Sequence, residues 1–165
     1  MLSRFRNKKI PDIYLFFSHF LDHFTILVFA KAAYDAGQDI GLTYGETIQL
    51  ATLGFILFGV ASPIAARVAD IFSRSLIMVV FHFGVGISSI MLSFSHTSFH
   101  LLLGLSSLGF FAAIFHPVGI AMLLENKERV GLRLGINGLF GNMGVASAPL
   151  ITGCLLYTSP SPRDL

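Results

Sequence analysis

Five long apolar stretches fill most of this chain, and only short, more polar connections separate them. An apolar run of about 18 residues or more is long enough to cross a bilayer as a helix. Because hydrocarbon offers no partner to bare N–H and C=O groups, such a run must satisfy its backbone internally. The runs are too long and too continuous for the alternating strands of a membrane barrel. The sequence therefore predicts an all-α membrane protein, with helices near residues 13–33, 46–65, 76–94, 101–124 and 134–156.

The composition agrees with a membrane protein. Hydrophobic residues make up 54% of the 165 residues and charged residues only 12%, whereas about a quarter of a soluble domain is charged. The net charge of +2 is too small to suggest a nucleic-acid partner. The sequence contains no Gly-x-x-x-x-Gly-Lys phosphate-binding motif, so nothing in it indicates an ATP-driven pump.

Lysine and arginine are distributed unequally between the two sides of the predicted helices. One side carries Arg4, Arg6, Lys8 and Lys9 before the first helix, Arg67 and Arg74 in the second connection, and Lys127, Arg129 and Arg133 in the fourth. The opposite side carries only Lys31, beside Asp35 and Asp39. Since cytoplasmic loops are enriched in Lys and Arg, we expect residues 1–12 to form a cytoplasmic basic tail. We expect the protein to be integral to a bacterial inner (plasma) membrane.

The character of the sequence changes abruptly over residues 154–165, Cys-Leu-Leu-Tyr-Thr-Ser-Pro-Ser-Pro-Arg-Asp-Leu. This segment resembles the translation of a sequencing adapter, and segments of that kind are excluded from fold reasoning. On this interpretation Cys154 is not native, and residues 13–153 form an incomplete bundle of helices one to five. The natural protein would then continue beyond Gly153. The alternative is a natural tail rich in serine and proline.

An acid and a base stand four residues apart in the second connection, at Asp70 and Arg74. The segment from residue 66 to residue 74 resembles the loop motif of the major facilitator superfamily, Gly-x-x-x-Asp-Arg-x-Gly-Arg. Ala66 and Ser73 replace glycines of that motif, and Ile71 replaces a basic residue. The resemblance implies that Asp70 and Arg74 form a conformational latch between neighbouring helices. The alternative is an ordinary basic loop with an incidental acid.

Small residues are concentrated in the fifth span. Its glycines Gly135, Gly138, Gly141 and Gly144 recur at a spacing that lets helix backbones approach closely, and Pro149 permits a bend. The pattern resembles the antiporter motif of the same superfamily, Gly-x8-Gly-x3-Gly-Pro-x2-Gly-Gly, although Ala148 and Thr152 replace two of its glycines. The alternative is a generic helix whose small residues serve packing alone.

Two further segments indicate one branch of the superfamily. The fourth span contains Phe115-His116-Pro117, and the first contains Ser-His-Phe-Leu-Asp-His at residues 18–23. With the fifth-span motif, these segments resemble the fosmidomycin resistance-type branch of the superfamily, over residues 18–153. That resemblance implies twelve helices in two halves, of which this chain is most of the first. It also implies a secondary transporter that exchanges protons for a small organic compound or drug.

Three ionisable residues lie inside the first span, where a charged group is costly and usually faces a cavity or a partner. His19, Asp22 and His23 are spaced i, i+3 and i+4, so they share one helix face. Because histidine titrates near neutral pH, we predict that these three residues carry the coupled proton. Two alternatives are hydrogen bonding between helices and a zinc site. No further ligand stands at an evident spacing, so we expect no metal and no cofactor.

Other polar residues inside the spans are candidates for substrate contacts. We predict that His116 lines a central cavity and that Asn142 reaches the substrate, whereas Asn137 packs between helices. We predict that the His82 side chain forms a hydrogen bond between helices.

The resulting prediction is proton-coupled efflux of a small organic compound by a protein that is not an enzyme. The expected partners are the substrate, protons, the lipid bilayer and the missing carboxy-terminal half. An importer of a sugar or organic acid is the first alternative. A membrane-embedded, histidine-dependent enzyme is the second, but it would need clustered ligands at the cytoplasmic ends of helices, and here the histidines are mid-helix and scattered along the sequence.

The predicted topology can be tested by labelling. We expect a membrane-impermeant thiol reagent to reach cysteines placed at the two ends of the first span from opposite sides of the membrane. Labelling of both ends from one side, or recovery of the protein in the soluble fraction without detergent, would contradict the prediction.

Overall fold

The computed structural model describes residues 10–125 and 128–158, all of them in helices or short connections. The helices are α1 (Asp12–Asp39), α2 (Tyr44–Ile71), α3 (Arg74–Ser93), α4 (Ser98–Ala112), α5 (Phe115–Leu124) and α6 (Val130–Thr158). Predictions for Arg4, Arg6, Lys8, Lys9, Lys127 and residues 159–165 lie outside the described part of the chain.

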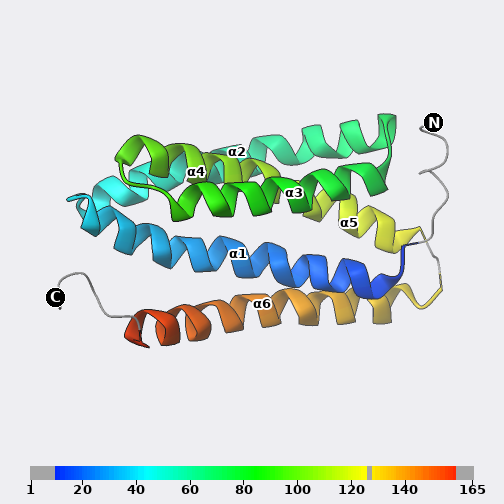
Figure 1. Cartoon of the computed structure of the whole chain (residues 1–165). Coiled ribbons are helices and arrows are strands. Elements are labelled where there is room, and N and C mark those ends of the chain that lie inside the picture. The colour runs from blue at the N-terminus through cyan, green and yellow to red at the C-terminus, as the bar shows by residue number, and fades with distance from the viewer. Residues whose placement is uncertain (1–9, 126–127, 159–165) are drawn as a thin grey trace.

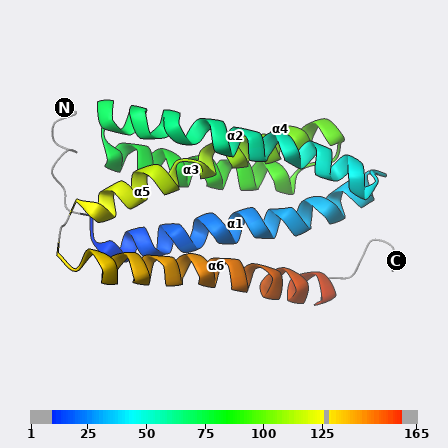
Figure 2. The same cartoon turned by 180° about the vertical axis from the view of Figure 1, so that it is seen from behind.

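The predicted all-α architecture is confirmed, with five spans long and apolar enough to cross a membrane. α4 and α5 together form the fourth span, Ser98–Leu124. Successive spans run in opposite directions (Figures 1 and 2). α1 and α6 lie side by side, and α2, α3 and α4 form a second group. The core lies where α3, α4 and α5 meet, around the fully buried side chains Met78, Phe81 and Phe115.

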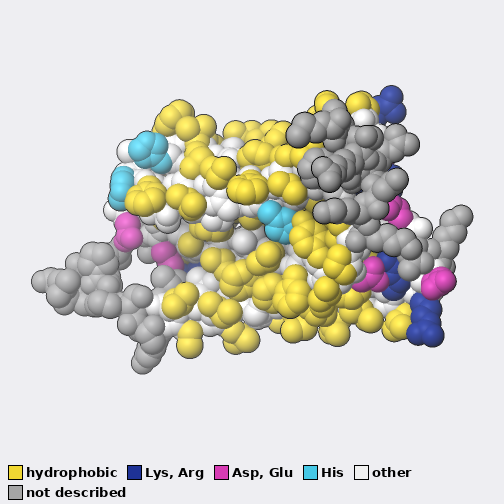
Figure 3. Space-filling model, turned by 45° about the vertical axis from the view of Figure 1, so that its right-hand side comes forward, with side chains coloured by type: hydrophobic (Ala, Val, Ile, Leu, Met, Phe, Trp, Pro, Cys, Tyr) yellow, Lys and Arg dark blue, Asp and Glu magenta, His cyan; other side chains and the backbone are white. Residues whose placement is uncertain are grey.

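Charged side chains are concentrated at the two ends of the bundle, and a broad hydrophobic band separates them (Figure 3). One end, which we call the basic end, contains the beginnings of α1, α3 and α6 and the ends of α2 and α5 (Figure 1). Arg67, Arg74, Arg129 and Arg133 belong to this end. The distribution is that of a bundle whose middle faces lipid and whose ends face water.

The first helix is longer than predicted. The sequence predicted a first helix that ends near residue 33, but α1 continues to Asp39 and is terminated by Gly41. Gly41 adopts φ +83°; its N–H bonds to the Gln38 carbonyl, and the Leu42 N–H bonds to the Gly37 carbonyl. These two bonds form a Schellman motif, which needs a left-handed residue at that position. Gly37 instead lets α1 approach Thr47 of α2.

The second connection is also shorter than predicted. α2 continues to Ile71, so only Phe72 and Ser73 separate it from α3. The break falls there because the Ser73 side chain accepts a hydrogen bond from the Leu76 N–H and begins α3. α2 itself begins with a capping box, in which Thr43 and Glu46 bond to each other's backbone N–H groups.

The fourth span is interrupted between Ala112 and Phe115. Pro117 has no N–H, so the carbonyl four residues earlier, that of Ala113, loses its helical partner. Just before this point the Ile114 N–H bonds to the Phe111 carbonyl, three residues back, where a regular α-helix would bond four residues back. This break ends α4, begins α5 and sets the direction in which His116 points.

Glycines allow the closest helix contact in the second group. A Cβ added at Gly109 of α4 would collide with the backbone of Gly54 in α2, and one at Gly54 would lie 2.6 Å from the Leu105 carbonyl oxygen. The sequence reasoning did not single out this pair, because the two glycines lie in different spans and form no motif within either one.

This contact generates a stability prediction. We expect Gly109→Ala to destabilise the bundle by about 1–3 kcal/mol, the usual cost of overpacking. The control is Gly86→Ala, at an exposed position where an added Cβ meets no atom within 4 Å. Thermal unfolding in detergent is the measurement. Equal melting temperatures for the two variants would contradict the close approach of α2 and α4.

Candidate functional site

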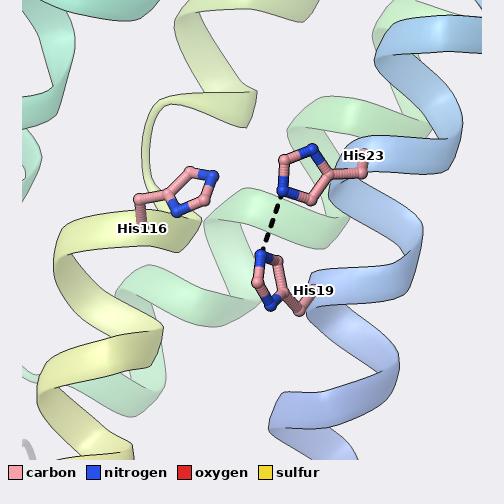
Figure 4. Close-up of side chains that lie close together, drawn as sticks. All are labelled: His19, His23 and His116. Carbon is pink, nitrogen blue, oxygen red and sulfur yellow. Dashed lines mark hydrogen bonds between the residues drawn. The ribbon is translucent and has the colours of Figure 1, made fainter. Parts of the chain in front are cut away.

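Two histidines one turn apart on α1 and a third from α5, distant in the sequence, converge inside the bundle. His19 and His23 project from one face of α1, and His116 projects toward them from the first turn of α5 (Figure 4). Their nearest ring nitrogens all lie within 4.8 Å of one another. The expectation that the histidines are scattered is therefore wrong in space, because the break before α5 turns His116 toward α1.

Asp22 is the most deeply buried polar group beside these rings. Its side chain is 0% exposed, and its Oδ2 lies 3.4 Å from His116 Nε2. Neither carboxylate oxygen has a hydrogen-bond partner among the described residues, so the contact with His116 is close without being a well-aligned hydrogen bond. Asp22 lies about 15 Å along α1 from its beginning, which is near the middle of a hydrocarbon core about 30 Å thick.

The chemistry of Asp22 depends on His116. An ionised carboxylate buried without a positive partner is strongly disfavoured. His116 can supply the positive charge only when it is protonated. The pair is therefore stable either as a neutral acid beside a neutral imidazole or as a carboxylate beside an imidazolium. The difference between these two states is the position of one proton.

The protonation pattern of His19 follows from its hydrogen bonds. His19 Nδ1 lies 2.8 Å from the backbone carbonyl oxygen of Asn137 in α6. A carbonyl only accepts, so Nδ1 carries the hydrogen and a neutral His19 has a free acceptor at Nε2. His23 Nε2 lies 3.0 Å from that nitrogen and donates to it. A second proton at this junction would place two N–H groups against each other.

We call His19, Asp22, His23 and His116 the histidine–aspartate cluster. Phe115 stacks on His19 at a ring-centroid distance of 4.9 Å, and Phe58 lies edge-on to His116 at 6.1 Å. The cluster is partly open, because the His116 side chain is 39% exposed. Aromatic rings thus border a small polar site in which the His116 ring is accessible.

The asparagines of α6 are placed differently from one another. Asn137, predicted to pack, is only 2% exposed; its carbonyl holds His19, and its side-chain Oδ1 has no partner among the described residues. Asn142 is exposed, and its contact with substrate stays a prediction. The sequence could have predicted that Asn137 faces α1. It is spaced i, i+4 and i+7 with Gly141 and Gly144, the two glycines that face that helix.

Only two of the four predicted packing glycines contact another helix in the described structure. An added Cβ at Gly141 would strike the His19 ring, and one at Gly144 would strike the backbone of Phe20. At Gly135 and Gly138 it would meet nothing within 4 Å. The reason is that a three-residue step turns by about 300°, so such a stripe drifts around a helix of 3.6 residues per turn. Pro149 lies within α6, which continues past it.

His82 makes the contacts between helices that were predicted for it. Its ring nitrogens lie 3.1 Å from the Tyr14 hydroxyl and 3.2 Å from the Ser18 hydroxyl, both on α1. Its Nδ1 is also 2.8 Å from the Met78 carbonyl of its own helix. These bonds account for a polar side chain within α3, so we assign it no further role.

The predicted pair at the basic end is present and has a third member. Arg74 lies 3.0 Å from Asp70 at the end of α2 and 2.8 Å from Glu125 just after α5. A second ion pair joins Arg133 of α6 to Asp12 of α1. Glu125 and Asp12 were not identified from the sequence because each pair joins helices distant in the chain. The two Arg74 pairs are exposed, and an exposed pair contributes only about 0–1 kcal/mol, so they can break when helices move.

A cavity of about 610 Å³ opens between α1, α2 and α4, toward the end opposite the basic end. Apolar and aromatic side chains dominate its wall, among them Ile26, Phe29, Phe55 and Phe58, and polar atoms come from Lys31, Tyr34, Tyr44 and Thr47. Phe58 also borders His116, so the cavity reaches the neighbourhood of the cluster. Its volume falls within the range of pockets that hold small organic molecules.

Comparison with known proteins gives one match. The family model described as Major Facilitator Superfamily matches residues 15–163. No curated protein and no solved structure matches the chain.

The cluster also has the composition of a possible metal site, since three imidazoles and a carboxylate are zinc ligands. A metal would have to displace the proton that His23 donates to His19. We expect that proton to stay in place and therefore expect no bound metal. Elemental analysis of protein purified without chelator should find no stoichiometric zinc, copper or nickel. A stoichiometric metal that is lost in His116→Ala would contradict this expectation.

Proposed function

The chain belongs to the Major Facilitator Superfamily, whose members are secondary transporters, and from this membership we propose that it exports a small organic compound in exchange for protons. The alternative of a membrane-embedded enzyme receives no support from this family. Direction, substrate and coupling ion are the parts of the proposal that need an experiment.

The observation that carries the proposal is the fully buried Asp22 beside His116. An ionisable group at membrane depth commonly belongs to a proton or substrate pathway. Here the carboxylate and three imidazoles offer several proton positions within a few ångströms of one another. In our proposal Asp22 holds the coupled proton together with His116, while His19 and His23 share a second one.

The cavity supports a largely apolar substrate. Its wall is mostly aromatic and aliphatic, with hydroxyls and one ammonium group near the rim. A compound with an aromatic or aliphatic body would fill it, and a polar end could reach His116 past Phe58. A highly hydroxylated sugar would leave most of its hydrogen-bonding groups facing apolar side chains, which is costly. The cavity thus supports a largely apolar organic compound, rather than a sugar, as the substrate.

Exchange requires that the proton and the substrate favour opposite access states of the protein. We propose that this chain is the amino-terminal half of a twelve-helix transporter and that the other half covers the open side of His116. α1–α3 and the helices from α4 onward would then be two repeats about a midplane site. Asp70, Arg74 and Glu125 would latch the basic end in one state, and the closely packed glycines of α6 would let it slide on α1.

The proposal is tested with the complete reading frame that contains this chain. In inverted membrane vesicles carrying a proton gradient, a pH-sensitive dye reports proton movement as neutral, cationic and anionic aromatic compounds are added in turn. We expect at least one compound to dissipate the gradient. We expect Asp22→Asn to abolish the response, because the amide cannot accept the proton.

The matched control is Asp39→Asn, the same substitution at the exposed last residue of the same helix, which does not line the cavity. This variant should respond like the wild type. An unchanged response in Asp22→Asn would remove Asp22 from the mechanism. Uptake of nutrients without any drug-induced proton movement would favour the importer instead.

A further inference from the structure

α6 contacts the His19 ring at Gly141, a position that has no side chain. A Cβ added at Gly141 would lie 2.6 Å from Cε1, 2.7 Å from Nε2 and 2.9 Å from Nδ1 of His19. Three ring atoms at nearly equal distances place Gly141 over the face of the imidazole rather than at its edge. No other residue type leaves this space empty, since every other side chain begins with a Cβ.

His19 is held from several other directions as well. Phe115 of α5 stacks on the ring with an interplanar angle of 24°. The Asn137 carbonyl, one helical turn before Gly141, binds Nδ1. The titratable groups around the ring are His23 and Asp22 on α1 and His116 on α5. α6 therefore contributes both a carbonyl that fixes the tautomer of His19 and a gap that admits its ring.

We propose that Gly141 is a positioning residue. The space left by its missing side chain lets the His19 ring lie where Nδ1 reaches the Asn137 carbonyl and Nε2 reaches His23. With alanine at this position, the methyl group must displace the ring, because α6 already touches the backbone of α1 one turn later, at Gly144. Displacement breaks the Asn137 bond and releases the tautomer. The effect of Gly141 on proton coupling rests on the proposed function, whereas its effect on the position of the His19 ring does not.

The geometry assigns this role to Gly141 and to no neighbouring glycine of α6. Gly138 lies three residues earlier, where an added Cβ meets nothing within 4 Å. Gly144 lies three residues later and faces the backbone of Phe20 rather than a histidine. Gly138→Ala therefore reports the effect of alanine on α6 itself, and Gly144→Ala reports a wedge between α1 and α6 that leaves the ring alone.

The first measurement is nitrogen NMR of histidine-labelled protein in nanodiscs, with the His19 signals identified by their loss in His19→Ala. We expect the wild type and Gly138→Ala to show a single tautomer protonated at Nδ1, and Gly141→Ala to show a mixture. A His19 spectrum that is the same in Gly141→Ala and in the wild type would overturn the proposal, as would an equal change in Gly138→Ala.

A double-mutant cycle covers the case in which Gly141→Ala folds poorly. If the methyl group clashes with the ring, removing the ring relieves the clash, so the loss of melting temperature caused by Gly141→Ala should disappear in a His19→Ala background. The loss caused by Gly144→Ala should persist there. An equal loss from Gly141→Ala in both backgrounds would show that the ring is not what the glycine accommodates.

Proton movement in the vesicle assay separates this inference from the proposed function. We expect Gly141→Ala to shift the pH at which the response is half-maximal, while Gly138→Ala leaves it unchanged. If the wild type moves no protons, the proposed function fails, and NMR and the cycle still decide the role of Gly141. If the tautomer changes but the pH profile does not, positioning by Gly141 has no part in coupling and that part of the proposal is overturned.

Discussion

Every polar group inside the hydrocarbon core of a membrane needs a hydrogen-bond partner within the protein, and this requirement governs the structure. Backbone groups meet the requirement by forming helices throughout the five spans, and the helix ends meet it with caps at Thr43 and Ser73 and with the Schellman motif at Gly41. Side chains meet it by bonding between helices, as His82 does with Tyr14 and Ser18. Asp22, Ser106 and Asn137 are described residues with buried oxygens that are not satisfied in this way. Asp22 is the ionisable one of the three, and an ionisable group so deep in the bundle calls for a functional explanation.

The histidine–aspartate cluster depends on two departures from regular helix packing. Pro117 interrupts the fourth span, and the new direction of the chain brings His116 to within 3.4 Å of Asp22. The absence of a side chain at Gly141 lets α6 pass directly over His19. A straight fourth span or a bulkier residue in α6 would leave the same histidines in the chain but separate their rings. Small local changes in backbone chemistry thus decide whether these four side chains form one site.

Weak contacts at the basic end complement rigid contacts in the middle. Arg74 with Asp70 and Glu125, and Arg133 with Asp12, join different helices through side chains that are partly exposed. Such pairs are individually weak, whereas the glycine contacts between α2 and α4 and between α1 and α6 bring the helices very close together. A bundle of this kind can exchange its end contacts while its helices keep their neighbours, which suits a protein that alternates between access states.

The sequence by itself determined the features that depend on one segment at a time. Apolar length fixed the five spans, the positions of Lys and Arg marked the basic end, and helical periodicity placed His19, Asp22 and His23 on one face. Only the tertiary structure decided which segments meet: His116 with Asp22, Asn137 and Gly141 with His19, Glu125 with Arg74, and the cavity beside Phe58. The physical reason is that periodicity is a local property of one helix, whereas the rotation of a helix against its neighbour is set by packing. The fifth-span glycines illustrate this difference, since their shared spacing suggested one face and the turn of the helix carried two of the four away from it.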